Sequence, residues 1–369
     1  GTTWLQIEHD NSTALPEIAC GLERCNIPLY DIIFGMLHDD ERAWKKIKDW
    51  IDVAKVLHTL KNARFGFMGH VFEWMMDMQF DPTMVTGHFS SHVEMLEMGD
   101  LDHCVKNVTE EELQKKIKEV KDFFDFPQSG ADTIAGPVTP EQLEWSSRVS
   151  VGLDHLIKDF RLDGLTYYYY GRHAPRYVEL VPGMIVGNSL LTGRGVPVAG
   201  EGDMKNCIAM LIMNKFGVGG SFAELHPANL RDGYVFIGHD GPHDIAIADG
   251  KPVLRGLSLL HGKSGQGASV EFKLKTGPIS MLGLTQRFDG SFKFVYAEGE
   301  SIPGPIPATG NTNTRCIFGL DIPTFIENWS KAGSTHHFAL SIGHNLSRVE
   351  KLAKVLGIEL EVVCDASML

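Results

Sequence analysis

Four side chains that could bind one metal ion stand out in this sequence: Glu201, Glu224, His239 and His337. Each lies beside small residues or glycine, and each comes at the predicted end of a strand. A divalent cation needs oxygen and imidazole ligands that converge on one point, with positions left open for a substrate. We therefore predict that these two carboxylates and two imidazoles form a single metal site.

The kinds of ligand in this set narrow the choice of ion. Any one of these residues alone would more often be a turn or helix-cap residue, so the prediction depends on all four acting together. A mixed carboxylate and imidazole set without a thiolate favours Mn²⁺, or a neighbour such as Co²⁺ or Mg²⁺, over structural zinc. Mn²⁺ is accordingly the predicted cofactor.

The elements around Glu201 explain why this residue is placed for chemistry. A short strand is predicted at residues 196–198, and Asp203 is a good N-cap for a helix with a long apolar face. Gly217 is the predicted end of that helix. Glu201 thus lies between the end of a strand and the start of a helix, which is where open α/β sheets place their sites.

The first two thirds of the chain alternate between strand and helix patterns, which is typical of α/β proteins. Apolar spacing at residues 39–62 predicts an amphipathic helix, and capping signals at Thr109 and Thr139 predict two more. The other elements predicted here are strands at 4–7, 30–35, 64–70 and 163–167, and a helix ending at residue 25.

From residue 220 the pattern changes to strands joined by Gly, Asp and Pro turns. Strands are predicted at residues 234–238, 245–247, 269–274, 278–284 and 292–296, and Asp289-Gly290 is a strong hairpin signal. The tail predicts a helix at 321–332, a strand at 337–342, a helix at 345–356 and a strand at 358–364.

The predicted fold class is therefore α/β, with parallel-sheet α/β domains followed by a C-terminal domain that contains an antiparallel β-sheet or barrel. We place the domains at residues 1–62, the remainder of a first α/β domain, at 63–219, a central α/β domain, and at 220–369, a β-rich domain that completes the metal site.

Composition excludes several classes of function. The 369 residues carry a formal net charge of -13, which argues against nucleic acid as a partner, because phosphate contacts need clustered Lys and Arg. No run approaches the roughly 20 apolar residues of a membrane span. Six cysteines without a CxxC pair indicate free buried thiols. We expect a cytoplasmic protein.

Several motifs resemble those of one enzyme family. Gly200-Glu201-Gly202-Asp203-Met204-Lys205, Gly219-Gly220-Ser221-Phe222-Ala223-Glu224, Gly238-His239, Thr276-Gly277-Pro278 and His336-His337 are similar in order and interval to those of the L-arabinose isomerases. The chain is identified as a member of the arabinose/fucose isomerase superfamily. This resemblance implies Mn²⁺ held by Glu201, Glu224, His239 and His337, an aldose-ketose isomerisation, and a homo-trimer or homo-hexamer with sites built between subunits.

The same resemblance shows where this chain departs from the family. The family has a further α/β segment before the point that matches Gly1, so we expect the N-terminal part of the family fold to be missing from this sequence. In the turn at residues 11–16, Ser12 and Pro16 replace the family's glutamine and histidine. The metal ligands match better than the sugar contacts, so the substrate is predicted only as a pentose, hexose or deoxyhexose.

The expected reaction moves a proton between C1 and C2 of the sugar through a cis-enediol, while a divalent cation polarises the carbonyl. Glu201 and Glu224 are the predicted base and acid, in either order. A hydride shift is the rival mechanism. A metal-dependent epimerase or aldolase on the same scaffold, and a non-catalytic sugar-binding relative, are the alternative functions.

Weaker signals mark additional candidates. Met68, His70, Tyr169 and His336 are predicted substrate contacts, although packing is the more common role for residues at strand ends. His88 and His92, with Glu94 beyond them, would share one face of a helix if a helix forms there. That arrangement would be a second metal site.

Overall fold

The computed structural model describes residues 11–128, 135–171, 173–241, 243–260, 263–307 and 309–369. Contacts divide the chain into two units, Gly1–Ile51 and Asp52–Leu369. The strand predicted at residues 4–7 lies outside the described residues. The domain boundaries predicted after residues 62 and 219 stay predictions.

The described part of the smaller unit, residues 11–51, contains helices and no strand. The predicted helix up to residue 25 is confirmed as α2 (Asn11–Arg24), but the turn predicted at residues 11–16 is wrong, because these residues already belong to α2. Helix α3 (Glu41–Asn62) confirms the next predicted helix and continues into the larger unit. The strand predicted at residues 30–35 is wrong, because this stretch has no regular structure. A strand needs a neighbouring strand for its backbone groups, and none of the pairings between described strands includes residues 30–35.

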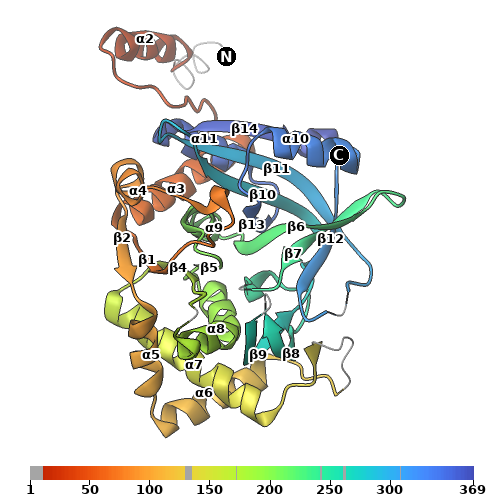
Figure 1. The fold of residues 1–369 in the computed structure, drawn as a ribbon. Helices are drawn as coiled ribbons and strands as arrows, with labels where there is room; N and C mark the ends of the chain where they lie inside the picture. Colours follow the sequence, from red (N-terminus) through yellow and green to blue (C-terminus); the bar gives the residue numbers. More distant parts are fainter. Residues whose placement is uncertain (1–10, 129–134, 172, 242, 261–262, 308) are drawn as a thin grey trace. The chain divides into compact units, whose positions relative to one another are not determined.

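The larger unit begins with an open sheet of four parallel strands in the order β2-β1-β4-β5 (Figure 1). Its helices include α6 and α7, whose predicted capping boxes are both formed, with Thr109 and Thr139 as N-caps. The bounds are β1 Arg64–Gly69, β2 His92–Leu96, β4 Gly164–Tyr168, β5 Val198–Ala199, η1 Met76–Met78, α4 Pro82–Phe89, α5 Met98–Lys106, α6 Glu110–Phe123, α7 Pro140–Phe160 and α8 Pro175–Gly193.

The second metal site suggested by His88 and His92 is not formed. His88 lies near the end of α4, whereas His92 begins strand β2. Between them, Ser90 adopts a left-handed conformation with φ of 58° and ends the helix. The two imidazoles therefore do not share a helix face.

The carboxyl ends of β1, β4 and β5 meet at one edge of the parallel sheet, as parallel strands require. His70 donates its backbone N–H to the carbonyl of Tyr168 (3.1 Å), and Gly202 donates to the carbonyl of Tyr167 (3.0 Å). These two hydrogen bonds join the three strand ends. Glu201, in the turn after β5, is thereby held at this edge.

The C-terminal part forms a second, larger sheet in which six strands close on themselves. Neighbouring strands run antiparallel around the ring β10-β13-β6-β7-β12-β11, which closes by the pairing of β11 with β10. The predicted hairpin at Asp289-Gly290 joins β10 and β11. Strand β14 adds in parallel to β11. The bounds are β6 Ser221–Asn229, β7 Tyr234–His239, β10 Gly277–Gln286, β11 Phe292–Ile302, β12 Thr312–Phe318, β13 His337–Ile342 and β14 Glu359–Cys364.

Two predictions in this region are corrected. Residues Ile245–Ile247 form the 3-10 helix η2 and not a strand, because the side chain of Asp244 accepts a hydrogen bond from Ala246 N–H and turns the chain. The strand predicted at 269–274 ends at Glu271, in a small antiparallel sheet. The remaining elements are β3 Ala135–Gly136, β8 Val253–Leu260, β9 Lys263–Glu271, α10 Ile322–Lys331, α11 Leu346–Leu356 and η3 Ala366–Met368.

Helix α9 (Met204–Lys215) lies between the two larger sheets. It packs against β4 and β5 on one side and against β6, β10 and β13 on the other, and Met204 to Met213 are all buried. The Asp203 carboxylate caps it by accepting from Asn206 N–H (3.0 Å), as predicted. Because α9 contacts both sheets, its N-terminus is fixed relative to each of them.

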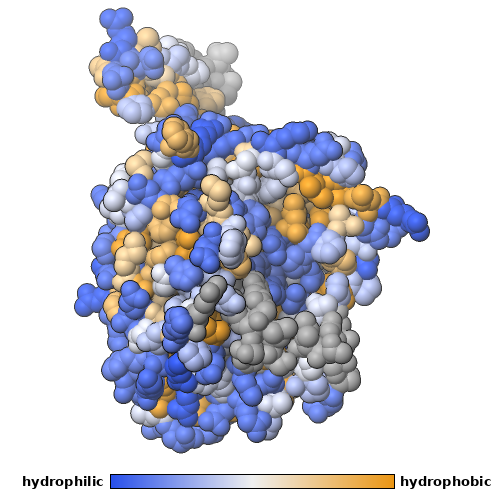
Figure 2. Space-filling view, viewed as in Figure 1, coloured by the Kyte–Doolittle hydropathy of each residue, from blue (hydrophilic) through white to orange (hydrophobic). Residues whose placement is uncertain are grey.

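The visible face of the larger unit is mainly hydrophilic, with apolar side chains at several places that include the projecting β6–β7 hairpin (Figure 2). Leu230, between these two strands, is 64% exposed. Among the described helices, none is both long enough and apolar enough to cross a membrane.

A glycine in the closed sheet offers a test of how tightly its strands pack beside the site. A Cβ on Gly238 would lie 1.7 Å from the carbonyl oxygen of Thr312 on β12. We expect Gly238→Ala to force β7 and β12 apart and to lower the free energy of unfolding in urea by about 1–3 kcal/mol, the usual cost of overpacking.

The matched control is Gly136→Ala in strand β3, where a Cβ meets no described atom within 4 Å. Its effect is expected to stay within about 0.5 kcal/mol, as for most surface changes. Equal stability of the two variants would contradict the packing described here.

Candidate metal centre

The turn that carries Glu201 is strained and tightly packed. Glu201 has φ of 59° and Gly202 has φ of 78°, and a left-handed conformation costs a residue with a side chain about 1–2 kcal/mol. The Glu201 carbonyl accepts from Phe72 N–H (3.0 Å). A Cβ on Gly202 would lie 2.7 Å from Val71 Cα, so only glycine fits there. The turn is held in one conformation by its surroundings.

Three adjacent strands of the closed sheet bring the other predicted ligands together. His337 on β13 lies opposite Glu224 on β6, and Glu224 lies opposite Gly238 on β7, next to His239. The register of these antiparallel pairs therefore places three predicted ligands at one position of the sheet. The N-terminus of α9 brings Glu201 to the same place.

The four predicted ligands converge. His239 Nε2 lies 3.2 Å from His337 Nε2 and 4.0 Å from both Glu201 Oε1 and Glu224 Oε1. His337 Nε2 is 3.7 Å from Glu201 Oε2. Glu201, His239 and His337 are buried, at 7%, 3% and 0% exposure. Two carboxylates and two imidazoles so close together match the ligand preference of Mn²⁺, Mg²⁺ and related ions.

Two overlapping groups of three could hold an ion among the described residues: Glu224, His239 and His337, and Glu201, His336 and His337. Both groups use His337. The Nδ1 of His337 lies 3.2 Å from Asp203 Oδ2, so only its Nε2 is available to an ion. The geometry therefore fits one ion and not two.

Asp203 is a functional candidate that the sequence predicted only as a helix cap. One of its oxygens caps α9, and the other accepts the Nδ1–H of His337, leaving the lone pair of Nε2 directed into the site. A carboxylate behind a histidine in this way fixes the tautomer of a metal ligand. Its position two residues after Glu201 was the only local signal.

Glu224 and His239, two of the other three predicted ligands, also have partners behind them. His226 Nε2 lies 3.2 Å from Glu224 Oε1, and its Nδ1 faces Asn313 Oδ1 at 2.5 Å. His239 Nδ1 has the Asp240 carboxylate at 3.2 Å and the N–H of Gly241 at 3.1 Å. These two contacts require different tautomers, because the Gly241 N–H needs a lone pair on Nδ1 whereas the Asp240 carboxylate accepts an Nδ1–H. His239 offers a lone pair at Nε2 only in the tautomer whose Nδ1–H faces Asp240.

Charges in the site shift several pKa values. Burial raises the pKa of Glu224, but the hydrogen bond from His226 and the nearby His239 outweigh it, so the pKa lies below its ordinary value. Burial lowers the pKa of His337, and Asp203 only partly opposes this. Both shifts favour the forms that bind a cation, an ionised carboxylate and a neutral imidazole.

The four predicted substrate contacts differ in their burial and in their distance from the predicted metal ligands. Met68 is fully buried in the main core. His70 donates Nδ1–H to the Val71 carbonyl (2.7 Å) and accepts from Tyr170 N–H (3.4 Å). Tyr169 is half-buried and lies beside His70. His336 is the one that reaches the converging ligands, with Nε2 3.8 Å from Glu201 Oε2.

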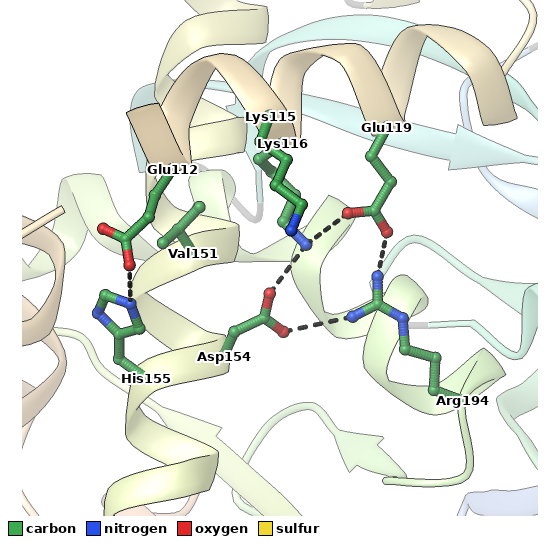
Figure 3. Close-up of a pocket in the computed structure, with 8 residues that line it drawn as sticks. All are labelled: Glu112, Lys115, Lys116, Glu119, Val151, Asp154, His155 and Arg194. Atoms are coloured by element: carbon green, nitrogen blue, oxygen red, sulfur yellow. Dashed lines mark hydrogen bonds and ion pairs between the residues drawn. The ribbon is translucent and has the colours of Figure 1, made fainter. Parts of the chain in front are cut away.

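A separate pocket of about 310 Å³ lies among α6, α7 and α8 (Figure 3). Lys116 Nζ is paired there with Glu119 (2.9 Å) and Asp154 (2.8 Å), and Arg194 contacts the same two acids. These cations and acids neutralise one another. The pocket is therefore an ion-pair network between helices and not a second metal centre.

Comparison with known proteins agrees with this architecture. Family models of the L-arabinose isomerase central domain and C-terminal domain match residues 81–219 and 219–359. The chain is 25% identical to an L-arabinose isomerase of Nocardioides sp. over 90% of its length and 66% of the relative's. It is 23% identical to that of Escherichia coli K12 over 88% of its length and 65% of the relative's.

The central and C-terminal domains of one family thus follow each other along this chain. It belongs to the L-arabinose isomerase family and spans about two thirds of the length of the curated relatives it matches.

The role of Asp203 can be tested by metal binding. Asp203→Ala removes the acceptor for His337 Nδ1–H, and we expect the affinity for Mn²⁺ to fall about 10–100-fold, the usual effect of removing such a partner. Asp203→Asn keeps an oxygen acceptor and should lose less. Titration of the metal-free protein with Mn²⁺, followed by electron paramagnetic resonance, measures both.

The matched control is Asp321→Ala, which removes the N-cap of α10, where the carboxylate accepts from Thr324 N–H (3.0 Å). It should cost about 1 kcal/mol of stability and leave Mn²⁺ affinity unchanged. Wild-type affinity in Asp203→Ala would show that His337 is not held through this carboxylate.

Proposed function

We propose that this chain is a metal-dependent aldose-ketose isomerase of the L-arabinose isomerase type. The observation that carries the proposal is that Glu201 Oε1, Glu224 Oε1 and His337 Nε2 all lie within 4.0 Å of His239 Nε2. These four residues would hold one divalent cation, with Mn²⁺ as the first candidate. Curated relatives named L-arabinose isomerase match 90% and 86% of this chain, which supports the proposed type of isomerase.

The bound cation would supply Lewis acidity that polarises the sugar carbonyl and offsets the negative charge that develops on its oxygen. The side chains around the cation would bind the sugar and transfer protons. Glu224 and His336 have about a third of their side chains exposed, whereas His239 and His337 are buried. The sugar would therefore enter on the side of Glu224 and His336.

The two glutamates would move the protons. One carboxylate would take the proton from C2, the C2–H electron pair would form the C1–C2 double bond, and O1 would receive a proton, giving the cis-enediol. A proton returned to C1 and one removed from O2 then complete the ketose. General acid-base catalysis of this kind contributes about 10²–10⁴-fold to a rate.

Further proposals follow from the family. The substrate would be a pentose, hexose or deoxyhexose. A homo-trimer or homo-hexamer and a cytoplasmic location stay predictions.

Turnover with and without the glutamates tests the proposal. In saturating Mn²⁺ with a panel of aldoses, the wild type should form a ketose, and Glu201→Gln and Glu224→Gln should each lower kcat by at least about 10²-fold. Glu327→Gln, at an exposed ion pair with Lys331, is the control and should match the wild type. Cleavage or epimerisation of the sugars in place of ketose formation would show that the protein catalyses a different reaction. Absence of any turnover would favour the alternative of a non-catalytic sugar-binding protein.

Solvent exchange distinguishes the two routes of hydrogen transfer. If a carboxylate carries the proton, turnover in D₂O should introduce deuterium at C1 of the ketose, because a carboxylic acid exchanges with solvent. Nuclear magnetic resonance of the product measures this. Complete retention of the substrate's hydrogen would instead indicate a hydride shift.

A further inference from the structure

His336 and His337 are consecutive histidines that each have a carboxylate behind Nδ1. For His337 this is Asp203, and both side chains are fully buried. For His336 it is Asp77, at 2.7 Å, and these two side chains are 32% and 38% exposed. Asp77 comes from a distant part of the chain, the 3-10 helix η1 between β1 and α4. The second pair therefore lies on the open side of the site.

Asp77 fixes both the backbone and the ring of His336. One carboxylate oxygen, Oδ2, accepts the backbone N–H of His336 at 3.1 Å and its ring Nδ1–H at 2.7 Å. Two hydrogen bonds from one oxygen to one residue leave the imidazole little freedom to rotate. With Nδ1 engaged, Nε2 is directed toward Glu201 Oε2, 3.8 Å away.

The segment that carries Asp77 is itself anchored to the Glu201 turn. Phe72 N–H donates to the Glu201 carbonyl (3.0 Å), and Lys205 Nζ donates to the Gln79 carbonyl (2.8 Å). Lys205 is only 1% exposed, and Met78 is fully buried. Asp77 is thus presented by a segment fixed on both sides, and it can act as a rigid support for His336.

From this geometry we propose that Asp77 is a positioning residue that holds the His336 imidazole against Glu201, at the place where a substrate hydroxyl would bind. Asp77 acts through His336 and touches neither the ion nor the sugar. The inference rests on the proposed isomerase function for its kinetic consequence. Its structural consequence, a fixed His336 ring, does not depend on that function.

Kinetics of two variants test the positioning role. Asp77→Ala should lower kcat by about 10²-fold, the effect expected when a reacting group is misplaced by about 1 Å, and should change Mn²⁺ affinity less than threefold. Asp77→Asn retains an oxygen that can accept both hydrogen bonds and should recover at least tenfold of the lost kcat. Unchanged kcat in Asp77→Ala, equal losses in both variants, or a Mn²⁺ affinity reduced tenfold or more would each overturn the proposal.

A spectroscopic measurement keeps the inference separate from the proposed function. In ¹⁵N-histidine-labelled, Mg²⁺-loaded protein, the His336 signals, assigned by their loss in His336→Gln, should show a protonated Nδ1 with slow solvent exchange. This protection should disappear in Asp77→Ala and persist in Asp77→Asn. If the wild type isomerises no aldose, the proposed function fails while this signature still decides the role of Asp77. Identical His336 signals in the wild type and Asp77→Ala would overturn the proposal directly.

Discussion

The carboxylate of Asp203 connects the scaffold to the candidate metal site. One oxygen caps the N-terminus of helix α9 and the other accepts a hydrogen bond from the ring of His337, so the start of the helix and the orientation of a predicted ligand depend on the same side chain. Because this group is fully buried, water does not compete for either hydrogen bond. A buried carboxylate is costly unless its hydrogen bonds are satisfied, and here a helix terminus and an imidazole satisfy them.

This arrangement works because α9 is shared between two sheets of different kinds. The parallel sheet supplies the strained turn that carries Glu201, and the closed antiparallel sheet supplies Glu224, His239 and His337 by the register of β6, β7 and β13. A shift of register by one residue would turn a side chain to the opposite face. The predicted ligands therefore meet only when both sheets are packed correctly on α9.

Much of this could be predicted from local sequence. The caps at Thr109, Thr139 and Asp203 and the hairpin at Asp289-Gly290 are short-range signals, and all four are formed. Two predicted strands, at residues 30–35 and 245–247, were wrong. They show the limit of prediction from local sequence, because an apolar run does not reveal whether a partner strand exists. Asp77 could not have been found, since it meets His336 across 259 residues and no local pattern marks it. The hydrogen bond from His337 to Asp203 could not be predicted either, because it also joins residues that are far apart in the sequence.

The convergence of the four ligands on one ion is tested most directly by diffraction from crystals grown with Mn²⁺, using anomalous scattering near the manganese edge. A single anomalous peak at coordinating distance from Glu201, Glu224, His239 Nε2 and His337 Nε2 is the predicted result. An ion bound elsewhere, or an ion at this place that leaves either glutamate or either histidine uncoordinated, would contradict the proposed ligand set.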